Sequence, residues 1–197
     1  NNTVKTEPDY AGAAIKAQDG ASQKAELNIT SSNSSDELNV TAEADAIKSS
    51  GDLSISGPGT VNTTSTASDG IEAKGDLSIT GSGTVNATGD TEGIQSGGNA
   101  TIDSSGTVIA KGGEGAGIDT GGDLIIKGGG QVEASSKETL AVDTGGSLTV
   151  TNASLNASGV EYGVYAYKGI TLDHATVTVR TSEGGGQAIA LFTDEDD

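Results

Sequence analysis

The feature that most constrains this chain is a repeat of apolar positions with a period of 22–25 residues. One series of apolar residues shows the period over most of the chain: Ile47, Ile71, Ile94, Ile118, Val142, Val164 and Ile189. Two further series keep the same spacing, one beginning at Leu53 and the other at Val61. Around each position apolar and polar residues alternate, and Gly, Asp and Ser separate the alternating segments. This pattern predicts three short, half-buried β-strands in every repeat.

Three strands per repeat predict an all-β fold, a right-handed parallel β-helix of about seven turns. Successive turns should be hydrogen-bonded about 4.8 Å apart, so equivalent residues stack in columns. A right-handed coil is expected because the hexapeptide repeat of left-handed β-helices is absent. Eight side chains are expected to point inward in two stacked turns: Ile47, Leu53, Ile55, Val61, Ile71, Leu77, Ile79 and Val85. Gly70 and Gly93 are expected to face outward.

The domain organisation follows from the same repeat. Residues 1–14 are expected to be a polar leader or cap, residues 15–193 a single β-helix domain, and residues 194–197 an acidic tail. A bare final strand at the end of such a solenoid favours end-to-end or edge self-association.

Composition agrees with a solenoid and excludes several kinds of protein. The 197 residues include 31 Gly and one Phe but no Trp, Met or Cys, so a deep globular core cannot be built, whereas a core one side chain deep can. Without Cys there is no disulfide framework and no thiolate metal site. The net charge of −18 argues against nucleic acid as a partner, and no apolar run is long enough for membrane insertion.

Stacked carboxylates are the first candidate site. They fall into three columns: Asp45, Asp69 and Glu92; Asp52 and Asp76; and Asp119 and Asp143. Like charges opposite one another on neighbouring strands destabilise a sheet, and a bridging Ca²⁺ with oxygen ligands would remove this repulsion. The alternative is that these Asp residues begin turns through hydrogen bonds to the backbone and extend into water.

Aromatic side chains form the second candidate site. Tyr165 and Tyr167 should point outward from one strand, and Phe192 should stack on Tyr167 one turn later. Such a group of rings can form a platform for sugar rings, whose C–H faces stack on aromatic faces. The alternative is that the rings pack against a cap or a second molecule.

Catalysis has little support in the sequence. The single His174 and the single Arg180 allow no Ser-His-Asp triad and no histidine metal site. A polysaccharide lyase of this fold would use calcium with an Arg or Lys base, but no column of carboxylates aligns beside Arg180. Paired Asp residues could serve in a glycosidase, yet on a repeat they are weak evidence. We therefore expect a protein that is not an enzyme.

The repeat itself resembles that of a known family. Residues 69–85 read Asp-Gly-Ile-Glu-Ala-Lys-Gly-Asp-Leu-Ser-Ile-Thr-Gly-Ser-Gly-Thr-Val, and Gly-Asp-Leu recurs at 51–53 and 122–124. This unit resembles the repeat of carbohydrate-binding β-helix proteins exported by cellulolytic clostridia and related Firmicutes, clearly over residues 45–134 and more loosely over 135–192. The resemblance implies bound calcium and binding to acidic or cellulosic plant polysaccharide, without catalysis.

The departures from the repeat limit what the resemblance implies. Ala116, Leu140 and Tyr162 replace the acidic residue of the first column in later turns, so any calcium column there should be short. The leading interpretation is a secreted or cell-surface bacterial protein that binds pectic or cellulosic polysaccharide with the help of calcium. A structural or adhesin stalk is the first alternative, and a lyase-like enzyme is the second.

Overall fold

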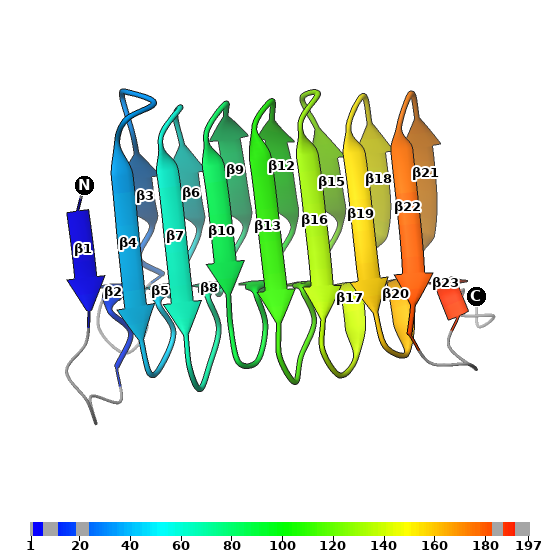
Figure 1. Ribbon diagram of the computed structural model, residues 1–197, viewed down its shortest axis with the longest axis horizontal. Coiled ribbons are helices and arrows are strands. Elements are labelled where there is room, and N and C mark those ends of the chain that lie inside the picture. The colour runs from blue at the N-terminus through cyan, green and yellow to red at the C-terminus, as the bar shows by residue number, and fades with distance from the viewer. Residues whose placement is uncertain (1, 6–11, 19–23, 183–186, 192–197) are drawn as a thin grey trace.

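The computed structural model describes residues 2–5, 12–18, 24–182 and 187–191. Within these ranges the chain is all-β, and its strands form three parallel sheets of eight, eight and seven strands. As the chain advances from left to right it runs down the first sheet, crosses the second and returns up the third, so the coil is right-handed (Figure 1). This is the predicted parallel β-helix. The structure contains no helix long and apolar enough to cross a membrane in its described ranges.

Each turn contributes one strand to each sheet. Sheet A contains β1 (Asn2–Lys5), β4 (Glu37–Ala42), β7 (Thr60–Ser65), β10 (Thr84–Thr88), β13 (Thr107–Gly112), β16 (Gln131–Ser136), β19 (Ser154–Gly159) and β22 (Thr176–Thr181). Sheet B contains β2 (Ile15–Ala17), β5 (Ile47–Ser49), β8 (Ile71–Ala73), β11 (Ile94–Ser96), β14 (Ile118–Thr120), β17 (Leu140–Thr144), β20 (Tyr162–Ala166) and β23 (Gln187–Leu191). Sheet C contains β3 (Leu27–Thr30), β6 (Leu53–Ser56), β9 (Leu77–Gly81), β12 (Ala100–Ser104), β15 (Leu124–Lys127), β18 (Ser147–Thr151) and β21 (Gly169–Asp173).

The strand register confirms the predicted apolar columns. In sheet B, Ile47 pairs with Ile71, Ile71 with Ile94, and the column continues without a slip to Ile189 in β23. The columns that begin at Leu53 in sheet C and Val61 in sheet A are equally regular. Because a slip of one residue would turn every apolar side chain outward, the regular columns hold the whole solenoid in one register.

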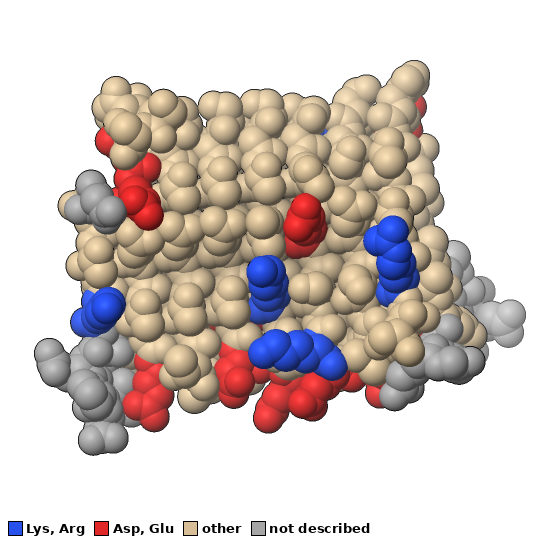
Figure 2. All heavy atoms as spheres, viewed as in Figure 1, with Lys and Arg blue, Asp and Glu red and all other residues tan. Residues whose placement is uncertain are grey.

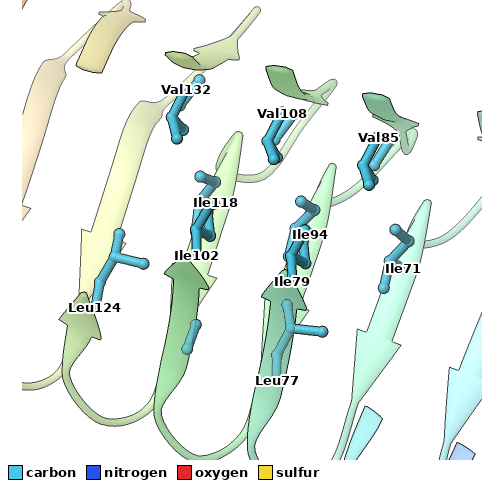
Figure 3. Packing of buried hydrophobic residues seen from close by; sticks show 14 of the residues in the cluster. Ile71, Leu77, Ile79, Val85, Ile94, Ile102, Val108, Ile118, Leu124 and Val132 are labelled. Carbon is cyan, nitrogen blue, oxygen red and sulfur yellow. The ribbon is translucent and has the colours of Figure 1, made fainter. Parts of the chain in front are cut away.

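The core lies where the three sheets face one another. All eight side chains predicted to point inward in the two stacked turns are buried, and Ile47 and Ile71 are completely enclosed. Figure 3 shows the core side chains stacked as layers from Ile71 onward, with Val85, Val108 and Val132 facing the Ile and Leu columns of the other two sheets. Equivalent side chains near the end of the solenoid are less buried: Leu172 is 50% exposed and Ile189 is 47% exposed.

The expectation that Gly70 and Gly93 face outward is wrong, because both residues are buried. A Cβ atom on Gly70 would lie 2.7 Å from the carbonyl oxygen of Gly93 and 2.9 Å from the backbone nitrogen of Thr88. The backbone of the next turn therefore packs against these glycines and leaves no room for a side chain.

Strand β1 lies inside the segment expected to be a leader or cap. It pairs with β4 and forms the first edge of sheet A. Phe192 and the acidic residues 194–197 fall outside the described residues.

Candidate functional site

The outer face of sheet B carries three of the predicted site residues, Asp119, Asp143 and Tyr165. Figure 2 shows a largely uncharged surface over sheet A and a gathering of acidic and basic side chains along the lower margin, where the loops that join sheet A to sheet B lie in Figure 1. Outward positions on neighbouring strands of sheet B stack in columns, so Asp119 lies beside Asp143 and Asp143 lies beside Tyr165. The structure thus brings two predicted metal ligands and one predicted sugar-stacking ring, Tyr165, into one column.

Asp45 and Asp69 meet in a buried cluster that also contains Glu72. One carboxylate oxygen from each residue lies within 4.8 Å of the others. The Lys48 Nζ atom lies 2.8 Å from Asp45 Oδ2 and also forms an ion pair with Glu72, which forms a second ion pair with Lys74. Lysine ammonium groups therefore already supply positive charge to Asp45 and Glu72, two of the three carboxylates of this cluster.

Hydrogen bonds tie the same cluster to the following turn. Asp45 Oδ1 accepts hydrogen bonds from the Ser68 hydroxyl and from the backbone N–H of Asp69, at 3.3 Å for the latter. Asp69 Oδ1 accepts corresponding bonds from the Thr91 hydroxyl and from the backbone N–H of Glu92, at 3.2 Å for the latter. Each carboxylate thus fastens its own turn to the next one, a structural role that requires no metal.

The two carboxyl groups of this pair differ in acidity. Burial alone would raise the pKa of Asp45, but the hydrogen bonds from Lys48 and Ser68 hold that pKa below its ordinary value. Burial, followed by the neighbouring Glu92, raises the pKa of Asp69 to about 6. The Asp69 carboxylate therefore still experiences repulsion from Glu92, whereas the ion pair with Lys48 stabilises the Asp45 carboxylate.

The column of Asp52 and Asp76 supports the turn-forming alternative. Asp52 Oδ1 accepts the backbone N–H of Asp76 at 2.9 Å, and Asp76 Oδ1 accepts that of Asn99 at 2.8 Å. Asn99 and Asp123 continue the pattern, with bonds of 2.9 and 2.8 Å to the next backbone N–H in turn. We call Asp52, Asp76, Asn99 and Asp123 the acceptor ladder. Its side chains bond the backbone, as the alternative to a calcium site expected, but each bond goes to the following turn of the solenoid and not to a turn that the residue itself begins.

The stack of Asp119 and Asp143 keeps its repulsion. Burial, then the charges of Asp143 and Asp69, raise the pKa of Asp119 to about 6. Burial also raises the pKa of Asp143, whose Oδ1 atom is enclosed without a hydrogen-bond partner in the described part of the chain. No lysine or arginine of the described ranges forms an ion pair with either residue.

The tyrosines form a cluster at the end of the same column. The ring centroids of Tyr165 and Tyr167 lie 5.0 Å apart at 76°, and Tyr162 packs edge-on against Tyr165 at 5.4 Å. The half-buried Tyr165 is held between two rings, and burial followed by the Tyr167 hydroxyl raises its pKa. Tyr167 is 46% exposed and offers the most open ring of the three. The third predicted ring, Phe192, lies outside the described residues.

Three residues of this face were not predicted from the sequence. Glu72 and Lys48 occupy the same column as Asp119, and their opposite charges on adjacent strands were the signal for an ion pair. Tyr162 was treated only as a replacement for an acidic residue. Tyr162 begins β20, where the alternation breaks because Gly163 and Val164 are both buried, so Tyr162 and Tyr165 lie on the same outer surface although they are three residues apart.

His174 and Arg180 lie away from this face. His174 follows β21, has a positive φ of 49° and contacts the neighbouring Asp173. Arg180 in β22 stacks on Ser158 of β19, and its column runs through Ser135, Lys111 and Thr88 without a carboxylate. Among the described residues, Arg180 therefore has no carboxylate in its own column.

Fold and surface together define a β-solenoid with an acidic and aromatic face. A family model described as carbohydrate-binding domain-containing protein matches residues 9–122, more than half of the chain. The chain therefore belongs to this family, in agreement with the resemblance of its repeat. No curated protein and no solved structure matches the chain. The matched residues include the Asp45 cluster and most of the acceptor ladder, while the tyrosine cluster lies beyond them.

Proposed function

We propose that this chain is a non-catalytic module that binds acidic plant cell-wall polysaccharide on the outer face of sheet B. The observation that carries the proposal is the single column in which Asp119, Asp143 and Tyr165 follow one another on adjacent strands. A cation between the carboxylates would then lie beside an aromatic ring. Membership of a carbohydrate-binding family supports the class of ligand.

Calcium fits the Asp119–Asp143 pair better than the other two carboxylate columns. Hard cations prefer oxygen ligands, and the Asp143 Oδ1 atom is enclosed with no hydrogen-bond partner among the described residues. Lys48 and Lys74 pair with Asp45 and Glu72, Asp69 accepts hydrogen bonds from Thr91 and Glu92, and backbone N–H groups satisfy the acceptor ladder. Asp119 and Asp143 are therefore the residues that would hold calcium in this protein.

Calcium would also reduce the electrostatic repulsion between this acidic protein and an acidic polymer. A protein with a net charge of −18 repels a polymer such as polygalacturonate. An ion held by two protein carboxylates has coordination positions left for carboxylates of the polymer and for water. Tyr167, and the part of Tyr165 that is accessible, would stack on the sugar rings next to the bridged carboxylate.

The proposed setting is the bacterial cell surface or its surroundings. Two carboxylate ligands make a weak calcium site, and weak sites of this kind fill in extracellular modules at calcium concentrations of about 10⁻⁴–10⁻³ M. The plant cell-wall polymer lies in the same extracellular setting.

The test is affinity electrophoresis in gels that contain polygalacturonate, with millimolar calcium or with EDTA. We expect calcium to retard the wild-type protein and EDTA to abolish the retardation. Asp119→Asn with Asp143→Asn should remove the calcium effect, while Asp52→Asn with Asp76→Asn, a stacked pair that loses the same charge, should keep it. Tyr165→Ala with Tyr167→Ala should weaken binding at saturating calcium by about tenfold.

Thermal unfolding provides an independent readout. An ion that binds only the folded protein raises the melting temperature, and the Asp119/Asp143 double variant should lose this rise. If calcium leaves the melting temperature and the polygalacturonate gel unchanged, the calcium site is wrong. If neither polymer retention nor ring dependence is seen, the solenoid acts as a structural or adhesive stalk instead.

A further inference from the structure

A second surface, on the opposite side of the solenoid from the front sheet, has the shape and chemistry of a binding groove. A groove of about 510 Å³ runs over five consecutive strands of sheet C, β3, β6, β9, β12 and β15. These strands lie side by side on the far side of the molecule in Figure 1, so the groove follows the solenoid axis.

Two parallel rows of polar groups line this groove. One row is the acceptor ladder, Asp52, Asp76, Asn99 and Asp123. The other row contains the hydroxyl groups of Ser54, Ser78 and Thr101, which stack on adjacent strands. Both rows repeat once per turn, about every 4.8 Å. Most turns along the groove therefore present a ladder side chain and a hydroxyl group side by side, repeated along the solenoid axis.

The ladder is rigid before any ligand arrives. Each of its members uses Oδ1 to accept a backbone N–H of the next turn, at 2.8–2.9 Å. The Oδ2 atoms of Asp52, Asp76 and Asp123 form no hydrogen bond or ion pair within the described ranges of the chain. Side chains already fixed in this way lose little conformational freedom on binding, which favours affinity.

The charge of the groove selects the kind of ligand. Glu26 and three carboxylates of the ladder line it, and no lysine or arginine of the described chain does. Such a groove repels an acidic polymer but accepts hydrogen bonds from sugar hydroxyl groups, which are donors to carboxylate oxygens. The Ser and Thr hydroxyls can donate or accept in the second row.

We infer that the sheet C groove binds a neutral, hydroxyl-rich polysaccharide that lies along the solenoid axis. The inference rests on the proposed carbohydrate-binding function but assigns a different surface and a different polymer class from the calcium and tyrosine face. The family match over residues 9–122 includes every lining residue of the groove except Asp123 and Ile125, whereas it excludes the tyrosine cluster.

The decisive variant fills the groove without disturbing the fold. Ile125 occupies the same column as Ser78 and Thr101, so this outward position tolerates an isoleucine in the native chain. Ser78→Ile with Thr101→Ile removes two hydroxyl groups and adds bulk. The control is Thr84→Ile with Thr107→Ile, which changes two paired outward residues of sheet A in the same way.

Binding is measured with hydroxyethylcellulose as the neutral probe, by affinity electrophoresis in EDTA. We expect wild-type binding that does not need calcium, a loss of tenfold or more in the Ser78/Thr101 variant, and wild-type binding in the Thr84/Thr107 control. Melting temperatures of the two variants verify that both are folded.

The outcomes separate this inference from the proposed function. Wild-type affinity for hydroxyethylcellulose in the Ser78/Thr101 variant, or no binding by the wild-type protein, overturns the groove assignment. Calcium-dependent retention on polygalacturonate would stand in either case. Loss of hydroxyethylcellulose binding in the Tyr165/Tyr167 variant alone would place the neutral polymer on the tyrosine cluster and also overturn the inference.

Discussion

At the scale of single residues, the Gly-Asp pair is the unit that joins one turn to the next. The carboxylate of Asp52 reaches over the α-carbon of Gly75 to accept the N–H of Asp76, and a Cβ atom on Gly75 would collide with Asp52 Oδ1. Gly98, Gly122 and Gly146 stand in the same relation to the next members of the ladder. Glycine at these four positions therefore leaves room for the ladder side chain of the preceding turn.

Asp76 tests whether the ladder depends on an acceptor atom or on a charge. Asp76→Asn keeps an oxygen that can accept the Asn99 N–H, as Asn99 itself does for Asp123, and should change the free energy of unfolding by no more than about 0.5 kcal/mol. Asp76→Ala removes the acceptor and should cost about 0.5–1.5 kcal/mol. Urea unfolding measures both. Equal losses in the two variants would show that the charge matters and the acceptor does not.

At the scale of the strands, stability comes from columns of apolar side chains that are one residue deep. Ile79, Ile102, Ile126, Val150 and Leu172 form one such column in sheet C. Its inner members are enclosed by the turn on either side and by the other two sheets, whereas its last member is covered on one side only. Two members of one column can thus contribute very differently to the free energy of unfolding.

Ile79 and Leu172 provide a matched pair for this difference. Ile79 is 2% exposed, so Ile79→Ala should leave a cavity and cost about 2–5 kcal/mol in the free energy of unfolding. Leu172→Ala removes a similar side chain that is 50% exposed and should cost less than half as much. Denaturant unfolding of the two variants makes the comparison. A similar cost at both positions would mean that the last turn is covered in solution.

The sequence predicted the strands and columns because a period of 22–25 residues leaves only one way to bury Ile47, Ile71 and their equivalents. It did not predict that Lys48 would lie against Asp45 and Glu72, since a long side chain on an outer face can point to either neighbouring turn. Nor did the alternation indicate that Gly70 is buried, because the backbone of Thr88, at the end of β10, encloses it.

At the scale of the whole molecule, the net charge is −18. The solenoid is thin, so most of its charged side chains lie at the surface. The carboxylates of the described surface differ in how they are compensated. Lysines pair with the Asp45 cluster, backbone N–H groups cap the acceptor ladder, and Asp69, Asp119 and Asp143 keep a raised pKa. The molecule should therefore be sensitive to pH at a few positions on one sheet.

The Asp69→Asn variant isolates one of these positions. The pKa of Asp69 is about 6 in the folded protein and 3.8 as the ordinary value, so the folded state binds the extra proton between these pH values. Stability contributed by this group is present at low pH and is lost as the pH rises through 6. Asparagine can still accept from Thr91 and Glu92 without the charge. In calcium-free buffer the variant should match wild type near pH 4 and be more stable by about 1–3 kcal/mol at pH 8.

Thermal melts of both proteins across this pH range measure the difference. A gap in stability that does not change with pH would indicate that Asp69 acts through packing and hydrogen bonding alone. The opposite slope, with the wild type gaining stability as the pH rises, would mean that a cation or lysine neutralises Asp69 in solution.

The hydrogen bonds of the acceptor ladder all run in one direction along the solenoid, and this affects how such a protein can evolve. Each rung takes its donor from the turn that follows, so a unit copied in tandem brings both its own acceptor and the glycine that makes room for the previous one. Duplication of one 24-residue unit would insert a turn without a new kind of interface and lengthen the sheet C groove by one step, about 4.8 Å. The length of polymer that the groove accommodates then depends on the number of repeats. That number changes by recombination between repeats and not by substitution within them.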